Sequence, residues 1–241
     1  IIRVRKIALH DENVFFWCAN VSCLAEQAKI LVAEAEANNL GVEAFNSRWA
    51  RWNTCSLCEQ DYHGVVRCAL SWACWKTYVG RSEGEVSEAR SYAMTELGNG
   101  LHDAEHHEDA LSVREARLSL ERRHGVSEES MLVAQSNLAN SLIMCGQFER
   151  ALSLNREIYA KNAELYGRNH GVTLITAGNL ASCLVDTLQQ FDEARAFLRD
   201  RIPEAIRTLG TDDGITFRLQ RMYAQSLYGN ADASAAMNTA A

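Results

Sequence analysis

Apolar residues in the second half of the chain recur at α-helical spacing, and the same pattern returns every 41 to 43 residues. The apolar residue that opens each unit is Leu97, Leu138, Leu180 or Tyr223. Four residues later each unit has a leucine, at Leu101, Leu142, Leu184 or Leu227. Units of this length predict helix–turn–helix pairs. Because one pair cannot bury its apolar face alone, neighbouring units must stack to form the core.

Small residues and glycines occur at matching places in these units. The residue after the opening position is Gly98, Ala139, Ala181 or Ala224, and the second helices share Ala110, Ala151 and Ala194. Small side chains at such places allow two helices to cross closely. Each later unit is preceded, thirteen residues before its opening position, by Gly125, Gly167 or Gly210. These glycines are expected to end helices, so the pattern predicts an all-α fold.

The segment "NLANSLIMCGQFERALSL" (residues 137–154) resembles the tetratricopeptide repeat, in the long form of about forty-two residues known from kinesin light chains. The resemblance covers residues 87–228, as three repeats and a partial fourth. It implies a tetratricopeptide-like α-solenoid, a right-handed superhelix of antiparallel helix pairs. Two departures stand out: His107 replaces the usual aromatic residue, and Gln189 or Gln190 is an extra residue in the third unit.

In such arrays the first helix of each unit lines a concave groove that binds a peptide or partner protein. The resemblance places six polar residues in this groove: Asn99, Asn137, Asn140, Asn179, Ser182 and Gln225. Asn137 and Asn179 stand where many relatives use an amide, which both donates and accepts, to bind a peptide backbone. The alternative is that these residues are only solvated helix positions. Val133 and Ile175 stand where some relatives have a lysine for a C-terminal carboxylate, so that ligand is not expected.

The first third of the chain is less regular. We expect an N-terminal segment with one main helix over 1–48, a degenerate helical pair over 49–86 and, at the other end, a disordered tail over 229–241. In the helical pair, Leu70 and Val79 are expected to pack inward and Ser71 to face outward. Cys68 and Cys74 are expected to be buried, which is usual for free cysteines.

Cys55 and Cys58 form a C-x-x-C motif, which supplies two of the four ligands that zinc needs. Together with Cys23 they resemble the distal half of a RING-CH-type zinc finger, which implies Cys23, Cys55 and Cys58 as metal ligands, with Cys18 or His10 as a fourth. The cysteine pairs of the proximal half are not found before Cys18. A thioredoxin-like function would require a βαβ context, and no strand pattern surrounds the motif.

Composition narrows the functional classes. A net charge of −7 and a pI near 5.5 argue against a nucleic-acid or anionic-membrane surface. No run of 18 apolar residues is present, so no membrane-spanning helix is expected. Eight cysteines in 241 residues are too sparse for a disulfide scaffold and suit reduced thiols in the cytoplasm.

No phosphate-binding glycine motif is present, and no catalytic residue is predicted. His102 and His106 have the spacing of a helical metal pair, but they straddle the turn of the first repeat, where a structural role is favoured. The sequence therefore predicts a non-catalytic scaffold that binds a partner protein or peptide in its groove, with zinc as the one cofactor to consider. The alternative is a ubiquitin-protein ligase whose zinc finger recruits a conjugating enzyme while the repeats recruit substrate.

Overall fold

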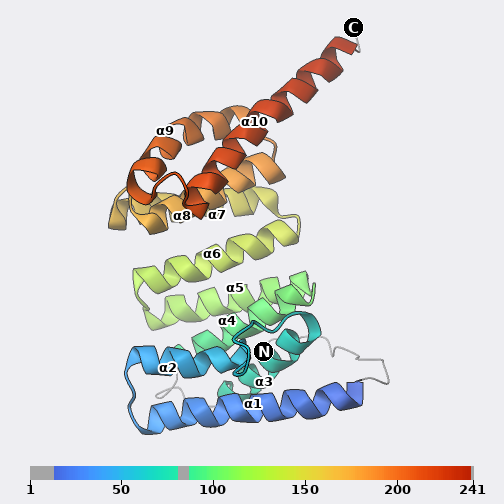
Figure 1. Ribbon diagram of the computed structural model, residues 1–241, viewed down its shortest axis with the longest axis vertical. Coiled ribbons are helices and arrows are strands. Elements are labelled where there is room, and N and C mark those ends of the chain that lie inside the picture. The colour runs from blue at the N-terminus through green and yellow to red at the C-terminus, as the bar shows by residue number, and fades with distance from the viewer. Residues whose placement is uncertain (1–13, 81–86, 240–241) are drawn as a thin grey trace. The chain divides into compact units, whose positions relative to one another are not determined.

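The computed structural model describes residues 14–80 and 87–239. Apart from one isolated β-bridge between Thr54 and Asp61, the regular structure of these residues is helical. The chain forms two compact units, Ile1–Ser127 and Glu128–Ala241 (Figure 1). The all-α class predicted from the repeat pattern is confirmed.

The first unit contains five α-helices and one short 3₁₀ turn in its described residues. They are α1 (Val14–Ala37), α2 (Val42–Trp49), η1 (Ala50–Trp52), α3 (Gly64–Tyr78), α4 (Ser87–Asp103) and α5 (His107–His124). One core cluster joins α1, α2, η1, α3 and α4 around Trp49, Trp52 and Tyr78, and a second joins α3, α4 and α5 around Cys68, Leu97 and Leu101. Aromatic side chains thus form the centre of the first core cluster, and leucines of the repeat pattern form much of the second.

Helices α3 and α4 cross at Gly100 and Ser71. A β-carbon at Gly100 would lie 2.3 Å from the Ser71 Oγ and 3.0 Å from the carbonyl oxygen of Arg67. Ser71, which was expected to face outward, is 1% exposed at this crossing. Val79, which was expected to pack inward, is 41% exposed, whereas Leu70 is fully buried as expected. The face of α3 that packs inward is therefore set by its close approach to α4.

The second unit contains α6 (Glu128–Met144), α7 (Phe148–Tyr166), α8 (Gly171–Ser182), α9 (Phe191–Leu209) and α10 (Gly214–Thr239). Along the chain each helix packs against the next, and α8 also packs directly against α10. Ala139, Ala151 and Ala194 of the repeat pattern are fully buried, as close helix crossing requires. Gly167 and Gly210 end α7 and α9 at positive φ values of 87° and 96°.

The extra residue of the third repeat is absorbed at the end of α8. Residues Cys183–Thr187 form a π-helical turn, η2, and Gln189 follows with a φ of 53°. A π-turn holds one residue more than an α-turn over the same rise, so a single insertion can be accommodated without moving the next helix. The predicted insertion at Gln189 or Gln190 therefore has its structural counterpart here.

Two segments differ from the sequence interpretation, and one leucine of the repeat pattern is exposed. The predicted pair over 49–86 contains one long described helix, α3, while α2 begins before the predicted boundary. The predicted disordered tail over 229–241 is helical as far as Thr239, because the alanine-rich segment has high helix propensity. Leu227, which continues the leucine pattern, is 45% exposed, since no later helix in the described part of the chain covers this face of α10.

Candidate functional site

Three residues of the second unit meet where α8 packs against α10. The guanidinium of Arg218 on α10 donates to the Oδ1 of Asn179 at 3.0 Å and to the Oγ of Ser182 at 3.0 Å, both on α8. The Ser182 hydroxyl in turn lies 3.5 Å from the sulfur of Met222. Two of the six predicted groove residues are thus brought together by an arginine that the prediction did not include.

Arg218 occupies the repeat position held by Val133 in α6 and Ile175 in α8, five residues before the opening residue of its unit. Aligning the fourth unit at Tyr223 would have identified it from the sequence. Burial lowers the pKa of the Arg218 guanidinium, the charge of Arg221 lowers it further, and Asp186 acts in the opposite direction. In the described part of the chain, the hydrogen-bonded partners of this guanidinium are neutral oxygens and no carboxylate forms an ion pair with it.

Exposed apolar side chains lie on the same two helices as this polar cluster. On α8, Val172, Ile175, Asn179 and Ser182 are three or four residues apart, so they share one stripe of the helix. Val172 is 40% and Ile175 44% exposed, and Phe217, next to Arg218 on α10, is 64% exposed. The α8–α10 surface, defined by these residues together with Arg218, combines one cation, amide and hydroxyl groups, and apolar area.

Among the residues that the structure describes, the other predicted groove residues of the second unit have no hydrogen bond to Arg218. On α6, Asn137 is half-buried and Asn140 is exposed. Gln225 on α10 is exposed and accepts a hydrogen bond from Arg221 at 3.2 Å. Their role in binding a partner stays a prediction.

Asn99 lies on α4 of the first unit and has a structural partner. Its Oδ1 accepts a hydrogen bond from the Nη2 of Arg114 at 3.1 Å. Arg114 is 6% exposed, and burial, followed by the charge of Arg117, lowers its pKa to about 10. This contact gives Asn99 a role inside the first unit.

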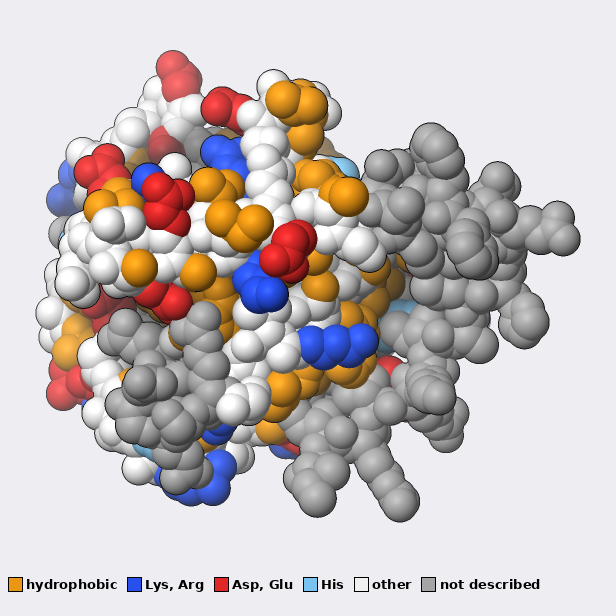
Figure 2. All heavy atoms as spheres, turned by 90° about the horizontal axis from the view of Figure 1, so that it is seen from below, with side chains coloured by type: hydrophobic (Ala, Val, Ile, Leu, Met, Phe, Trp, Pro, Cys, Tyr) orange, Lys and Arg blue, Asp and Glu red, His pale blue; other side chains and the backbone are white. Residues whose placement is uncertain are grey.

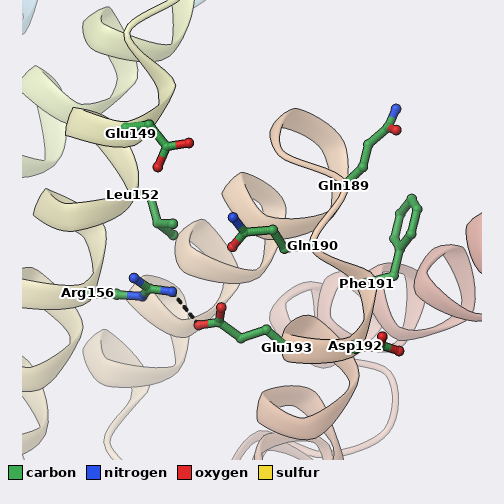
Figure 3. A pocket seen from close by; sticks show the side chains of 8 residues that line it. All are labelled: Glu149, Leu152, Arg156, Gln189, Gln190, Phe191, Asp192 and Glu193. Carbon is green, nitrogen blue, oxygen red and sulfur yellow. Dashed lines mark hydrogen bonds and ion pairs between the residues drawn. The ribbon is translucent and has the colours of Figure 1, made fainter.

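A hollow of about 440 Å³ lies between α7 and the start of α9 (Figure 3). Glu149, Leu152 and Arg156 come from α7, and residues 189–193 complete the lining. Arg156 and Glu193 point toward one another and form an ion pair at 2.5 Å. No signal in the sequence indicated this hollow, and its acidic lining does not by itself indicate a ligand.

Cys55 and Cys58 lie in a closed turn of the first unit, residues 54–61, which we call the cysteine turn. Thr54 and Asp61 form its β-bridge, and the Cys55 N–H donates to the carbonyl of Gln60 at 2.9 Å. Cys58 is exposed and Cys55 half-buried. Hydrogen bonds to Cys55 from the backbone of Cys58, the backbone of Leu57 and the Cys58 side chain lower the pKa of Cys55 to about 7.

The metal site expected from Cys23, Cys55 and Cys58 is not assembled in the part of the chain that the structure describes. Among those residues, no group of three or more histidine, cysteine or acidic side chains is placed to hold a metal ion. Cys23 is an exposed residue of α1, and the side chains of His10 and Cys18, the fourth ligands considered, lie outside the described residues. A C-x-x-C spacing fixes two ligands, but the other two depend on tertiary placement.

The histidines of the first repeat form a ring contact instead of the metal pair that was weighed. The ring centroids of His102 and His107 are 5.3 Å apart, so the partner of His102 is His107 rather than His106. Burial, followed by the charges of Arg114 and His107, lowers the pKa of His102. This favours the structural role assigned from the sequence.

The face seen in Figure 2, from below Figure 1 where α1 lies, has hydrophobic side chains between charged ones. Exposed apolar residues of the first unit are spread over several elements, with Ile30 on α1, Val42 on α2 and Val65 on α3. This spread marks no single apolar docking face among the described residues of that unit. None of the described helices combines the length and hydropathy that crossing a membrane would require.

Part of the chain is similar to a known protein family. Residues 130–203 match the family described as tetratricopeptide repeat. A comparison with curated proteins gave no significant match. The comparisons give no support to the zinc-finger resemblance.

Several solved structures share the fold. One is the structure of nearly identical TPR-like repeats of a Podosopora anserina protein that is named for kinesin light chain. The similarity covers 90% of this chain and 92% of that chain, with 17% identity and a TM-score of 0.59. A point variant of the same repeats is similar over 95% of this chain and 93% of that chain, with 19% identity and a TM-score of 0.57. BtubC (BKLC) from P. vanneervenii is similar over 92% of each chain, with 13% identity and a TM-score of 0.59. The chain therefore has a tetratricopeptide-like α-solenoid fold, matches the tetratricopeptide repeat over residues 130–203 and is similar in fold to kinesin-light-chain-like repeats.

Proposed function

We propose that this chain is a non-catalytic scaffold whose α8–α10 surface binds an acidic segment of a partner protein. The observation that carries the proposal is Arg218, held by Asn179 and Ser182 without a carboxylate partner in the described residues. A guanidinium has five N–H donors, so donors remain for a ligand after these two bonds. Charge-assisted bonds to a carboxylate are roughly twice as strong as those between neutral groups.

The exposed apolar side chains of α8 and α10 indicate the second requirement for the partner. Val172, Ile175 and Phe217 present side chains that are 40–64% exposed on the same pair of helices. Covering such area contributes about 25 cal/mol per Å² of apolar surface removed from water. A segment that carries both acidic and apolar side chains matches this combination better than a purely acidic one.

Asn179 has a second role besides the peptide binding expected from the sequence. Its Oδ1 is engaged by Arg218, so it orients the arginine, and its amide N–H₂ is the group that remains suited to a peptide carbonyl. On α6, Val133 and Asn137 have the same repeat register, and Val133 is 52% exposed. We include these two residues as the continuation of the binding surface along the repeats.

A ubiquitin-protein ligase function has no comparable support. Its zinc finger would need ligands beyond Cys55 and Cys58, and the described residues do not bring Cys23 into such a group. We place the scaffold in the cytoplasm, because eight sparse cysteines in 241 residues suit reduced thiols.

Binding to an array of defined peptides tests the proposal. In each peptide, acidic and apolar residues alternate. Each peptide also has a copy in which Asp and Glu are replaced by Asn and Gln. We expect the protein to prefer the acidic copies. Arg218→Gln should weaken binding of the acidic copies by at least about tenfold, since a hydrogen bond to a charged group contributes about 1.5–3 kcal/mol.

The matched control is Arg199→Gln, which removes an exposed arginine from α9 and the same unit of charge. Asn137→Ala and Asn179→Ala should each weaken binding while circular dichroism shows an unchanged helix content. Equal binding of acidic and amide copies, or an equal effect of Arg218→Gln and Arg199→Gln, would refute the assigned role of Arg218.

A further inference from the structure

The cysteine turn has a fixed shape that holds its two sulfurs together. The Glu59 N–H donates to the carbonyl of Cys55 at 3.0 Å, and Glu59 adopts a left-handed φ of 57°. The Thr54 hydroxyl donates to the Asp61 carboxylate at 2.9 Å across the neck of the turn. The turn is therefore closed at its neck by the β-bridge and at its tip by the Glu59 bond.

The tip of the turn exposes sulfur to solvent. Leu57, between the cysteines, is 93% exposed, and its N–H lies 3.5 Å from the Cys55 sulfur. Cys58 is exposed, and its thiol and backbone N–H both hydrogen-bond to Cys55. A small reagent can thus reach the pair, and the two sulfurs are already neighbours.

The turn is anchored to the core on its other side. Trp52, three residues before Cys55, is 1% exposed within the core cluster of the first unit. Asn53 donates from its Nδ2 to the Glu96 carboxylate of α4 at 3.1 Å and accepts from the Tyr62 N–H at 2.8 Å. This anchoring keeps the sulfurs in one arrangement instead of the many that an unfolded chain samples.

We propose that Cys55 and Cys58 form a thiol–disulfide exchange site, which accepts a low-molecular-weight disulfide of the glutathione class and closes into a Cys55–Cys58 disulfide. This is a modification site and not a thioredoxin-like enzyme, since the motif lies in a turn between helices. It is independent of the α8–α10 surface, because it uses residues of the first unit only.

The reaction has two exchange steps. The Cys55 thiolate attacks one sulfur of the small disulfide, which forms a mixed disulfide and releases one small thiolate. The Cys58 thiol then loses its proton and attacks the Cys55 sulfur, which forms the intramolecular bond and releases the second thiolate. The two cysteines are oxidised by two electrons, the small disulfide is reduced to two thiols, and the two protons pass from the cysteines to those thiols.

The lowered pKa of Cys55 sets the expected rate of the first step. At pH 7, a thiol with the ordinary pKa of 9.0 is about 1% thiolate, and one with a pKa of about 7 is about half thiolate. A Brønsted coefficient of about 0.45 reduces the reactivity of the less basic thiolate by about eightfold. The net gain is therefore about sixfold at pH 7, and it should disappear at about pH 8 and reverse at higher pH.

Mass spectrometry after acid quenching tests the proposal, with oxidised glutathione as the probe in a buffer that contains a chelator. The folded chain should lose two hydrogen atoms in mass, and digestion should map the bond to Cys55 and Cys58. Cys58→Ser should instead retain one glutathione on Cys55, because no second thiol resolves it. The reference is a synthetic peptide of residues 50–64, whose Cys55 should react about sixfold more slowly at pH 7.

Two outcomes would overturn the proposal. One is a wild-type chain in which Cys55 and Cys58 carry glutathione separately or remain free while Cys23 reacts. The other is a peptide that closes its disulfide as fast as the folded chain at pH 7. Mapping in the wild-type chain does not depend on the fold of any variant, so the result is decisive even if Cys58→Ser is unstable.

Discussion

Replacing Gly100 by alanine tests the close crossing of α3 and α4. The added β-carbon would lie 2.3 Å from the Ser71 Oγ, 2.7 Å from the Ser71 Cβ and 3.0 Å from the Arg67 carbonyl oxygen. Ser71 is 1% exposed, and its hydroxyl donates to that same carbonyl at 2.7 Å. It cannot turn away from the new methyl group without breaking a buried hydrogen bond, so the helices must separate.

The expected loss of stability follows from three contributions. Over-packing costs about 1–3 kcal/mol, and contacts this short point to the upper end. The lost Ser71 hydrogen bond adds about 1 kcal/mol. Alanine is better than glycine inside a helix by about 1 kcal/mol, which leaves a net loss of about 2–3 kcal/mol. With a urea m-value of about 2 kcal/mol/M, the unfolding midpoint should fall by about 1 M.

Tryptophan fluorescence during urea unfolding measures this change selectively. All five tryptophans belong to residues 1–127, so their emission reports the first unit. The control is Gly178→Ala in α8, followed by circular dichroism because residues 128–241 contain no tryptophan. The nearest atom there, Cδ of Arg218, is 3.5 Å from the added β-carbon, so helix propensity alone should act. Ser71→Gly in the Gly100→Ala background removes the two shortest contacts and should restore part of the midpoint. A Gly100→Ala midpoint at or above that of the wild type would refute the crossing.

Three further predictions concern single polar groups. Burial raises the pKa of Glu96 despite the hydrogen bond from Asn53, so the folded state keeps the proton on Glu96 to a higher pH than the unfolded state does. The folded state therefore loses stability as the pH rises above about 4.5. Glu96→Gln should flatten this fall in the urea midpoint measured by fluorescence and leave the midpoint at lower pH unchanged. Asp213→Ala should lower the free energy of unfolding by about 1 kcal/mol, measured by thermal unfolding with circular dichroism. The reason is that the Asp213 Oδ1 caps α10 by accepting a hydrogen bond from the Ile215 N–H at 2.8 Å. Asp213→Asn should retain most of this stabilisation. Glu121→Gln should destabilise the first unit by about 3 kcal/mol in urea unfolding. It removes the ion pair that the buried Arg117 guanidinium forms, within the described residues, with the Glu121 carboxylate at 2.9 Å; an unchanged midpoint would show that this pair is not buried in solution.

The repeat pattern was sufficient for the fold of the second half of the chain. Leu138, Leu142, Leu180 and Leu184 are buried where the spacing placed them, because one side of a helix in a stacked array must face its neighbour. Gly125 has a left-handed φ of 61° at the end of α5, as a helix-ending glycine should. These features are local or repeat regularly, so they can be read along the chain.

The hydrogen-bond partners of side chains could not be predicted from the repeat pattern. Asn179 and Arg218 are 39 residues apart, and only the packing of α8 against α10 makes them a pair. The repeat alignment identifies position 218, but not the direction in which its guanidinium points. In the same way, Ser71 lost its expected exposure because α4 presents a glycine to it at the crossing.

The sequence by itself determined the helical repeats, their ends and the C-x-x-C motif, since each depends on spacing within a few turns of chain. Tertiary structure alone decided which polar groups meet. Asn99 and Asn179 accept hydrogen bonds from arginines, and within the described residues Arg218 is bound only by neutral oxygens. Among these residues, Cys23 does not form a metal-binding group with Cys55 and Cys58. The physical reason is that hydrogen bonds and metal ligation act over about 2–3 Å, a distance that repeat spacing does not specify.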